Sequence, residues 1–158
     1  VDLMENVLDL AGKNYDLKKG YDFRSIDVKK EYETNMPLVH CTETEIEQVL
    51  LNLLSNATWA MAEREDDIPA QITLRIKTEK KMIRIEVEDN GPGMDEKTKA
   101  QLFEPFFTTK AVGEGTGLGL SVSYMIITNN HHGTMEVISE PGKGARFVVK
   151  LPLESVDR

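Results

Sequence analysis

The chain has 158 residues, 40% of them hydrophobic, which suffices for one sizeable core and is too short for two ordinary domains. Its formal net charge of -8 argues against a broad basic surface, so we expect no nucleic-acid partner and no membrane association. The sequence contains no apolar run of the ~18 residues that span a bilayer and no basic targeting segment at its start. The single cysteine, Cys41, fits a reducing compartment. We expect a single cytoplasmic domain over residues 1–158.

The first half of the chain alternates between helical and extended patterns. Apolar residues recur at helical spacing over residues 2–17, and a Lys-Lys-Gly sequence then predicts the helix end. Residues 25–33 alternate in polarity and residues 38–40 form a short apolar run after a proline, which predicts two strands. Thr42 and Glu45 fit a capping box. A long helix should follow, with one apolar face made of Ile46, Val49, Leu50, Leu53, Ala57, Ala60 and Met61.

The second half predicts a hairpin, an irregular stretch, a helix and two strands. Residues 71–79 and 82–88 alternate around two lysines, which is typical of a hairpin with one buried face. Residues 94–115 have no regular period, and such long connections are usually functional or disordered. A helix over about 117–130 and strands at 134–139 and 145–151 complete the chain.

The glycines are concentrated around the irregular stretch. Six of the eleven glycines lie between Gly91 and Gly119. The run from Gly113 to Gly119 opens into a helix, where glycine allows backbone N–H groups to approach an anion. A flexible hinge is the less favoured alternative for this run. The spacing matches neither a phosphate-binding P-loop nor a dinucleotide fingerprint, so those two nucleotide-binding folds are not expected.

Polar residues at two other places could bind the rest of a nucleotide. Asn52 and Asn56 lie four residues apart on one flank of the long helix, and amide oxygens can ligate Mg²⁺, although two such asparagines are more often ordinary polar surface. Asp89 ends a strand just before an Asn-Gly-Pro-Gly turn. Its carboxylate only accepts hydrogen bonds and could select the amino group of adenine, or it could serve turn formation alone.

In combination and in this order, the motifs resemble a known family. LLNLLSNA resembles the asparagine box, DNGPGM the first glycine box, FEPFFTTK the phenylalanine box and GEGTGLGL the second glycine box, and SEPGKGARFVVKLP resembles the closing strands. This is the pattern of the catalytic ATP-binding domain of sensor histidine kinases, in the superfamily that also contains gyrase B and MutL. The detail around Trp59 resembles the nitrogen-regulatory and dicarboxylate-sensor branch.

The resemblance implies a fold and a role for each motif residue. It implies an α+β fold, a two-layer sandwich in which a mixed, mostly antiparallel sheet of about five strands packs on three helices, with a long ATP lid over residues 95–116. Asn56 would coordinate Mg²⁺ with support from Asn52, and Asp89 would bind adenine at the opposite end of one cleft. The remaining nucleotide contacts would come from Gly91, Gly93, Met94, Phe103, Lys110, Gly113, Gly115, Thr116, Gly117, Leu118 and Gly119. Phe103, with Phe106 and Phe107, could equally fill the core.

Three positions depart from the family pattern. Trp59 replaces a lysine common three residues after the Mg²⁺ asparagine, which leaves Lys110 as the candidate phosphate contact. Asn52 stands where the ATPase relatives have a catalytic glutamate, and an amide cannot act as a general base, so rapid ATP hydrolysis is not expected. Ala145 replaces a common threonine.

The phosphate acceptor is not expected within these residues. None of His40, His131 and His132 has the HExxxPL context of a phosphoacceptor, and the latter two read as helix-terminal residues. We therefore expect a fragment of a homodimeric kinase whose full-length chain could carry a membrane anchor. It would transfer the γ-phosphoryl group of ATP to a histidine of a dimerisation domain and from there to a response regulator.

Other functional classes use the same fold. A regulatory module would bind ATP without transferring phosphate, and an anti-sigma-type serine kinase would phosphorylate serine. An ATPase motor is disfavoured by Asn52.

Overall fold

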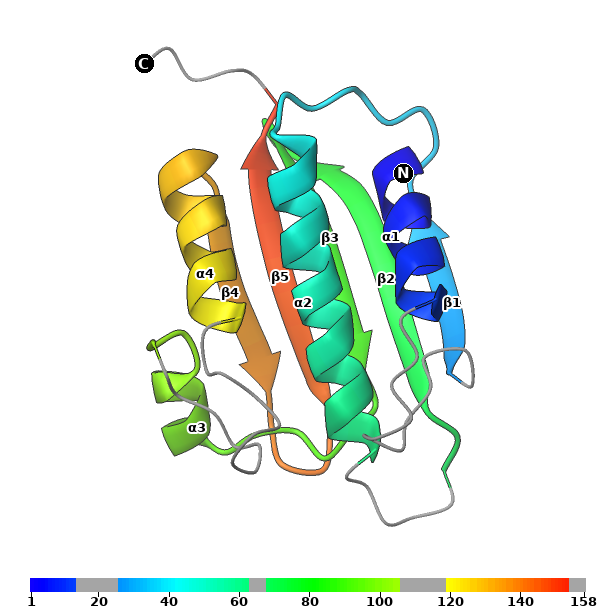
Figure 1. Cartoon of the computed structure of the whole chain (residues 1–158), viewed down its shortest axis with the longest axis vertical. Helices are drawn as coiled ribbons and strands as arrows, with labels where there is room; N and C mark the ends of the chain where they lie inside the picture. The colour runs from blue at the N-terminus through cyan, green and yellow to red at the C-terminus, as the bar shows by residue number, and fades with distance from the viewer. Residues whose placement is uncertain (14–25, 63–67, 106–118, 154–158) are drawn as a thin grey trace.

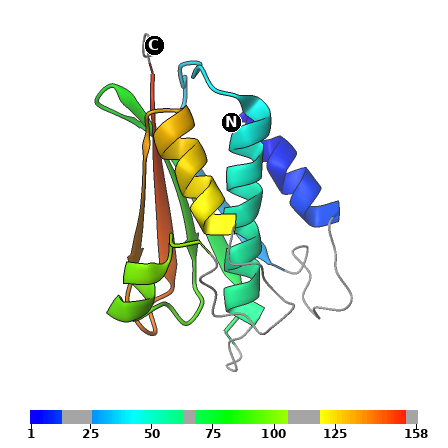
Figure 2. The same ribbon diagram turned by 60° about the vertical axis from the view of Figure 1, so that its left-hand side comes forward.

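The computed structural model describes residues 1–13, 26–62, 68–105 and 119–153, which form two layers (Figure 1). One layer is a five-stranded sheet, and the other consists of helices that cover one face of that sheet (Figure 2). This arrangement confirms the predicted α+β sandwich.

The sheet has the order β1-β2-β3-β5-β4. Only β1 and β2 run parallel, and the other neighbours are antiparallel. The strands are β1 (Asp27–Tyr32), β2 (Gln71–Glu79), β3 (Met82–Asp89), β4 (Thr134–Ser139) and β5 (Ala145–Pro152). The predicted hairpin is therefore confirmed, with Ile76 opposite Ile85 on the helix side.

One predicted strand is wrong. Residues 38–40 form no strand, and Leu38 is 95% exposed. An apolar run forms a strand only where its side chains have a surface to pack against, and this run crosses the top of the molecule as a connection from β1 to the long helix (Figure 1).

Three helical segments cover the inner face of the sheet. They are α1 (Asp2–Lys13), α2 (Glu43–Ala62) and α4 (Gly119–Met125), which continues as the π-helix η3 (Ile126–Asn130). The predicted face of α2 is buried apart from Ala60, which is half-buried. The largest fully buried side chains between the layers are Leu53, Leu54, Ile72, Leu74 and Ile127. This apolar face supplies the hydrophobic stabilisation of the fold.

A short helix lies where the sequence predicted only irregular structure. Helix α3 (Glu96–Gln101) begins after Asp95, whose side chain accepts a hydrogen bond from the Thr98 N–H at 2.7 Å. This cap satisfies one of the free amides at the helix start. The helix has no buried residue, so a hydrophobic period could not reveal it.

The start of α2 is capped by a residue distant in the sequence. The Thr42 N–H donates to Nε2 of His131 at 3.0 Å, and Nδ1 of the same ring lies 2.9 Å from the carbonyl oxygen of Ile126. Nε2 must accept, so Nδ1 carries the proton and donates. Glu45 instead accepts from Asn130 at 2.7 Å, so it is not the reciprocal partner expected in a capping box. The helix-terminal interpretation of His131 is confirmed.

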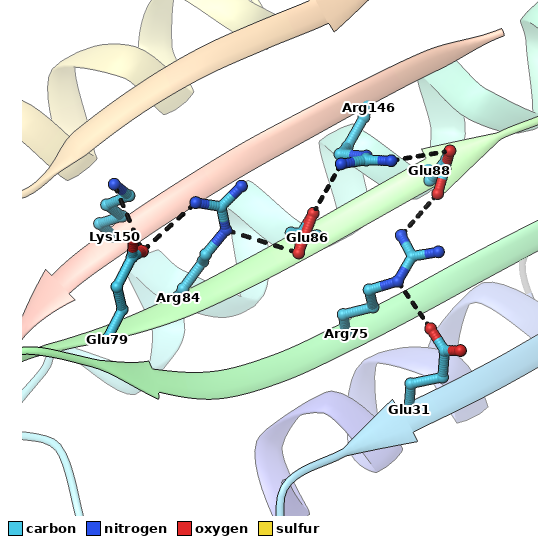
Figure 3. Close-up of polar contacts among 8 residues, drawn as sticks. All are labelled: Glu31, Arg75, Glu79, Arg84, Glu86, Glu88, Arg146 and Lys150. Atoms are coloured by element: carbon cyan, nitrogen blue, oxygen red, sulfur yellow. Dashed lines mark hydrogen bonds and ion pairs between the residues drawn. The ribbon is translucent and has the colours of Figure 1, made fainter. Parts of the chain in front are cut away.

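None of the described helices covers the outer face of the sheet (Figure 2), which carries a line of alternating charges (Figure 3). Arg75 on β2 pairs with Glu31 at 2.6 Å and with Glu88 at 2.5 Å. The line continues through Arg146, Glu86, Arg84, Glu79 and Lys150, which lie on β2, β3 and β5. Charged side chains thus predominate on the outer face of these strands, although buried Val148 also lies there opposite Glu86.

The ends of several elements meet at one end of the molecule. Figure 1 shows the last turn of α2 and the ends of β3 and β4 at the lower edge of the sheet, and the first turn of α4 beside the middle of α2. Of the predicted site residues that the structure describes, Asp89 ends β3 and Gly119 begins α4, whereas Asn52 and Asn56 lie within α2.

Candidate functional site

Asp89 is a buried acid at the end of a strand. It is the last residue of β3, and alternation along the strand places it on the helix side with Ile85 and Val87. Only 5% of the residue is exposed, and its Oδ1 accepts a hydrogen bond from the Gly91 N–H at 2.9 Å. The carboxylate is therefore oriented by the turn that follows it.

The turn after Asp89 packs directly against α2. A Cβ on Gly91 would lie 3.5 Å from the backbone carbon of Ala60 and 3.0 Å from Oδ1 of Asp89. Gly93 has a φ of +75°, and a Cβ there would lie 2.1 Å from the carbonyl oxygen of Glu140. A side chain at Gly93 would thus displace the turn, which explains why glycine is required there, whereas one at Gly91 would press on the Asp89 carboxylate.

Asn52 joins α2 to the first turn of α4. Its Nδ2 donates to the carbonyl oxygen of Gly119 at 3.2 Å and to the hydroxyl of Ser123 at 3.0 Å. A carbonyl oxygen can only accept, so the amide nitrogen must face Gly119. Both amide hydrogens of Asn52 are then used, and Ser123 is fully buried beneath the contact.

One flank of α2 connects these two contacts. Asn52, Asn56 and Ala60 are spaced four residues apart, which places them along the same side of the helix, over about 12 Å of its length. Asn52 contacts α4 at one end and Ala60 contacts the Asp89 turn at the other. Asn56 lies between them and is half-buried. The structure thus brings together the two groups of polar residues that the sequence singled out.

Phe103 and Met94, two further predicted contacts, both have partners within the protein. The ring of Phe103 stacks on Tyr124 of α4, with centroids 5.0 Å apart. This contact favours the packing role that the sequence left open for Phe103. The Met94 N–H donates to the hydroxyl of Ser139 at 2.9 Å.

Several predicted contacts lie outside the described residues. They are Phe106, Phe107, Lys110, Gly113, Gly115, Thr116, Gly117 and Leu118. Their roles stay predictions.

The described residues fit a metal bound mainly through a substrate. In the four described ranges, no group of three or more His, Cys, Asp and Glu side chains could hold an ion. Mg²⁺ commonly keeps several waters and binds through phosphates with one or two protein oxygens. The single amide oxygen of Asn56 is compatible with this mode of binding. The described residues do not provide the several carboxylate, imidazole or thiolate ligands that would hold an ion without a substrate.

A hollow is lined in part by Asp89 and by residues 90–92 of the turn that follows it. Its volume is about 750 Å³, and its walls include Thr73, Arg75 and Glu88 from the outer face of the sheet. Gly142 and Lys143 close it from the turn between β4 and β5. Because Arg75 and Glu88 already pair with each other, this hollow offers few unpaired groups to a charged ligand.

Two buried serines contribute to the site without having been predicted. Ser123 contacts Asn52, and Ser139 contacts Met94. Each contact joins elements far apart in the chain, and serine at the end of a strand or inside a helix is too common to be a signal on its own.

The comparisons with known proteins agree with this geometry. Residues 41–155 match the family described as histidine kinase-, DNA gyrase B- and HSP90-like ATPase. The signal transduction histidine-protein kinase AtoS of Escherichia coli (strain K12) is 40% identical over 131 residues, which is 81% of this chain and 20% of that protein. This chain therefore spans about a fifth of that relative.

Solved structures agree as well. The catalytic domain of histidine kinase ThkA has a TM-score of 0.77 and 30% identity, covering 96% of this chain and 92% of that one. ThkA in complex with response regulator protein TrrA has a TM-score of 0.74 and 28% identity, covering 97% and 40%. No helix among the described residues is long and apolar enough to cross a membrane. The chain belongs to the histidine kinase-, DNA gyrase B- and HSP90-like ATPase family and, within it, to the catalytic domains of histidine kinases.

Proposed function

We propose that this chain binds Mg-ATP along the flank of α2 and presents the γ-phosphate to a histidine on a dimerisation domain of the same kinase. The single observation that carries the proposal is the order of contacts on that flank. Asn52 meets α4 at one end, Ala60 meets the Asp89 turn at the other, and Asn56 lies between them. A nucleotide laid along the flank would place its base at the buried acid and its phosphates near the amides.

Each described residue has a distinct task in this proposal. Asp89 accepts a hydrogen bond from the amino group of adenine. It also accepts the hydrogen bond from the Gly91 N–H, which fixes the orientation of the carboxylate. Asn56 offers an amide oxygen to the metal ion. When bound, Mg²⁺ neutralises charge on the phosphates that develops during transfer.

Asn52 acts as a brace between α2 and α4 and cannot serve as a general base. Its amide hydrogens are occupied by Gly119 and Ser123. Phosphoryl transfer rests mainly on positioning and charge neutralisation, so a rigid brace suits transfer to a protein acceptor and does not promote attack by water.

The acceptor and the final partner would come from outside these residues. We infer a histidine on a dimerisation domain, a response regulator as the next acceptor, and a homodimeric kinase whose catalytic part lies in the cytoplasm. The assembly of ThkA with TrrA is an example of such a partner for a related chain. The sequence around Trp59 is the observation on which we assign the chain to the nitrogen-regulatory branch; NtrB of Vibrio alginolyticus, 32% identical over 159 residues, is one of several similar sensor kinases and does not single out this branch.

The test is phosphorylation in trans. The chain is incubated with γ-³²P-ATP, Mg²⁺ and a separately purified histidine-containing hairpin domain, with the His→Gln hairpin as control. We expect label on the intact hairpin alone, in the acid-labile and base-stable form of phosphohistidine. ATP binding without label would favour the regulatory module, and acid-stable label would favour a serine kinase. Either result would replace the proposal.

A further inference from the structure

The turn that follows Asp89 is fastened to a turn from another part of the chain. Residues 90–94 follow β3, and residues 140–144 join β4 to β5. Because β5 lies between β3 and β4 in the sheet, the two turns meet across the first residue of β5. The Gly142 N–H donates to the carbonyl oxygen of Pro92 at 2.6 Å, which is a direct backbone link between the turns.

Ser139 supplies the second link. Its hydroxyl accepts from the Met94 N–H at 2.9 Å and donates to the carbonyl oxygen of Gly144 at 2.7 Å. The direction of both bonds is unambiguous because an amide N–H can only donate and a carbonyl can only accept. Ser139 is 4% exposed, so water has little access to replace the hydroxyl. Loss of this hydroxyl would leave a donor and an acceptor without their partner.

We call the contact between residues 90–94 and residues 140–144 the junction. Close backbone packing makes this junction sensitive to small shifts. Gly144 has a φ of +74°, and a Cβ there would lie 2.1 Å from the carbonyl oxygen of Asp89. Gly142, with a φ of +82°, has open space within 4 Å of an added Cβ. The contact therefore depends on Gly144 in particular and does not extend to every glycine of the turn.

The junction is coupled to the carboxylate of Asp89. Oδ1 accepts from the Gly91 N–H, so a displacement of the turn moves the group to which the carboxylate is bonded. A binding group must be held within a fraction of an ångström by its neighbours to retain its effect.

We infer that Ser139 is a positioning residue for adenine recognition, acting through the turn rather than by touching the nucleotide. The inference rests on the proposed function, because it assumes that Asp89 binds the base. The Ser139 hydroxyl and the Gly144 backbone hold residues 90–94 in place, and this placement aims the acid.

The first experiment compares nucleotide affinities by calorimetry. Ser139→Ala should weaken ATP binding about tenfold, because two hydrogen bonds at the junction are lost. GTP affinity should change less than twofold, so that the preference for ATP narrows. Ser139→Thr keeps the hydroxyl and should restore most of the affinity. The matched control is Thr58→Val, which removes another buried hydroxyl. This hydroxyl donates to the carbonyl oxygen of Leu54 at 2.8 Å within α2 and does not link the two turns, so its loss should leave ATP affinity unchanged.

A second measurement needs no nucleotide. Hydrogen exchange of the Met94 amide should accelerate at least about tenfold in Ser139→Ala, while amides in the middle of β5 stay protected. If Ser139→Ala does not fold, Gly144→Asn and Gly142→Asn replace it, since asparagine tolerates positive φ. Gly144→Asn should lose ATP affinity and Gly142→Asn should retain it.

Three outcomes would overturn the inference. They are wild-type ATP affinity in Ser139→Ala, equal losses of affinity in Ser139→Ala and Thr58→Val, and an unchanged exchange rate at Met94. Failure of the proposed function is distinguishable from these, since the wild-type chain itself would then bind no ATP while the exchange rate at Met94 would still report the junction.

Discussion

The two ends of the α2 flank are built in different ways. At the Asp89 end, the shape comes from backbone packed on backbone, with Gly93 and Gly144 leaving no room for a Cβ. At the Asn52 end, the shape comes from one side-chain amide that reaches across to α4. The first end should therefore tolerate almost no change of shape, with the Ser139 hydroxyl as the side-chain link that holds its two turns together. The second end should depend mainly on the hydrogen bonds of the Asn52 amide.

The largest effect is expected at Asp89. Asp89→Asn keeps the size of the side chain and an acceptor for Gly91, but it turns an NH₂ group toward the amino group of adenine. Two donors then face each other, and we expect ATP affinity to fall on the order of 100-fold. Calorimetric titration with Mg-ATP measures the change. Asp95→Asn is the matched control, because asparagine caps a helix as well as aspartate does. If Asp89→Asn bound ATP with wild-type affinity, Asp89 would not be a nucleotide-binding residue.

The next effect concerns the metal. Asn56→Ala should lower the affinity for Mg-ATP about tenfold, because an oxygen ligand is lost, and should leave the weaker binding measured in EDTA unchanged. Calorimetric titrations with and without Mg²⁺ measure the metal-dependent and the metal-independent affinity separately. Ser55→Ala, at the exposed neighbouring position, should keep the full metal dependence. An equal loss in both conditions would mean that Asn56 does not act through the ion.

A smaller effect is expected at Asn52, and it tests whether side-chain chemistry shapes this end. Asn52→Asp removes both donors and sets a carboxylate against the Gly119 carbonyl, so we expect a loss of roughly 1–3 kcal/mol in the free energy of unfolding. Urea denaturation measures the loss. Gln48→Glu makes the same amide-to-acid change at an exposed position one turn earlier and should cost little. If both variants lose the same free energy of unfolding, the hydrogen bonds of Asn52 between α2 and α4 do not contribute to stability.

The same contrast explains what could be predicted from the sequence. The hairpin of β2 and β3 and the buried face of α2 follow from local hydrophobic periods, and the structure confirms both. The run at residues 38–40 has a strand-like composition, but it pairs with none of the described strands, and only Val39 packs against the core. Helix α3 has no buried residue, so a hydrophobic period gave a wrong prediction for the first segment and no prediction for the second.

Candidate site residues could be singled out from the sequence where a motif is local, and their contacts with a nucleotide stay predictions. Asp89 with its glycine turn, and Asn52 with Asn56, each stand in one short segment. Ser139 acts through Met94, 45 residues away in the chain, and no spacing within either segment indicates that contact. The roles assigned to Lys110 and to the glycines from Gly113 to Gly117 lie outside the described residues and stay predictions.

The smallest expected effect tests whether the charges behind the sheet contribute to the Asp89 end. Glu88 precedes Asp89 but points to the outer face, where it pairs with Arg75 and Arg146 (Figure 3). Burial raises the pKa of Glu88, but the two guanidinium groups outweigh this and hold the pKa below its usual value. A lowered pKa stabilises the fold above the pKa of an unfolded glutamate, about 4.3, and this contribution is lost as the pH falls through the folded pKa.

Glu88→Gln should therefore be less stable than wild type at pH 7, by no more than about 1 kcal/mol for a partly exposed pair. The difference should shrink on acidification below about pH 4, because the wild type alone loses the contribution of this carboxylate. Urea midpoints at several pH values measure this, with Glu96→Gln as the exposed control. ATP affinity should stay at the wild-type value. A loss of ATP affinity in Glu88→Gln would instead mean that side-chain charge behind the sheet helps to position Asp89, and the contrast between the two ends of α2 would no longer hold.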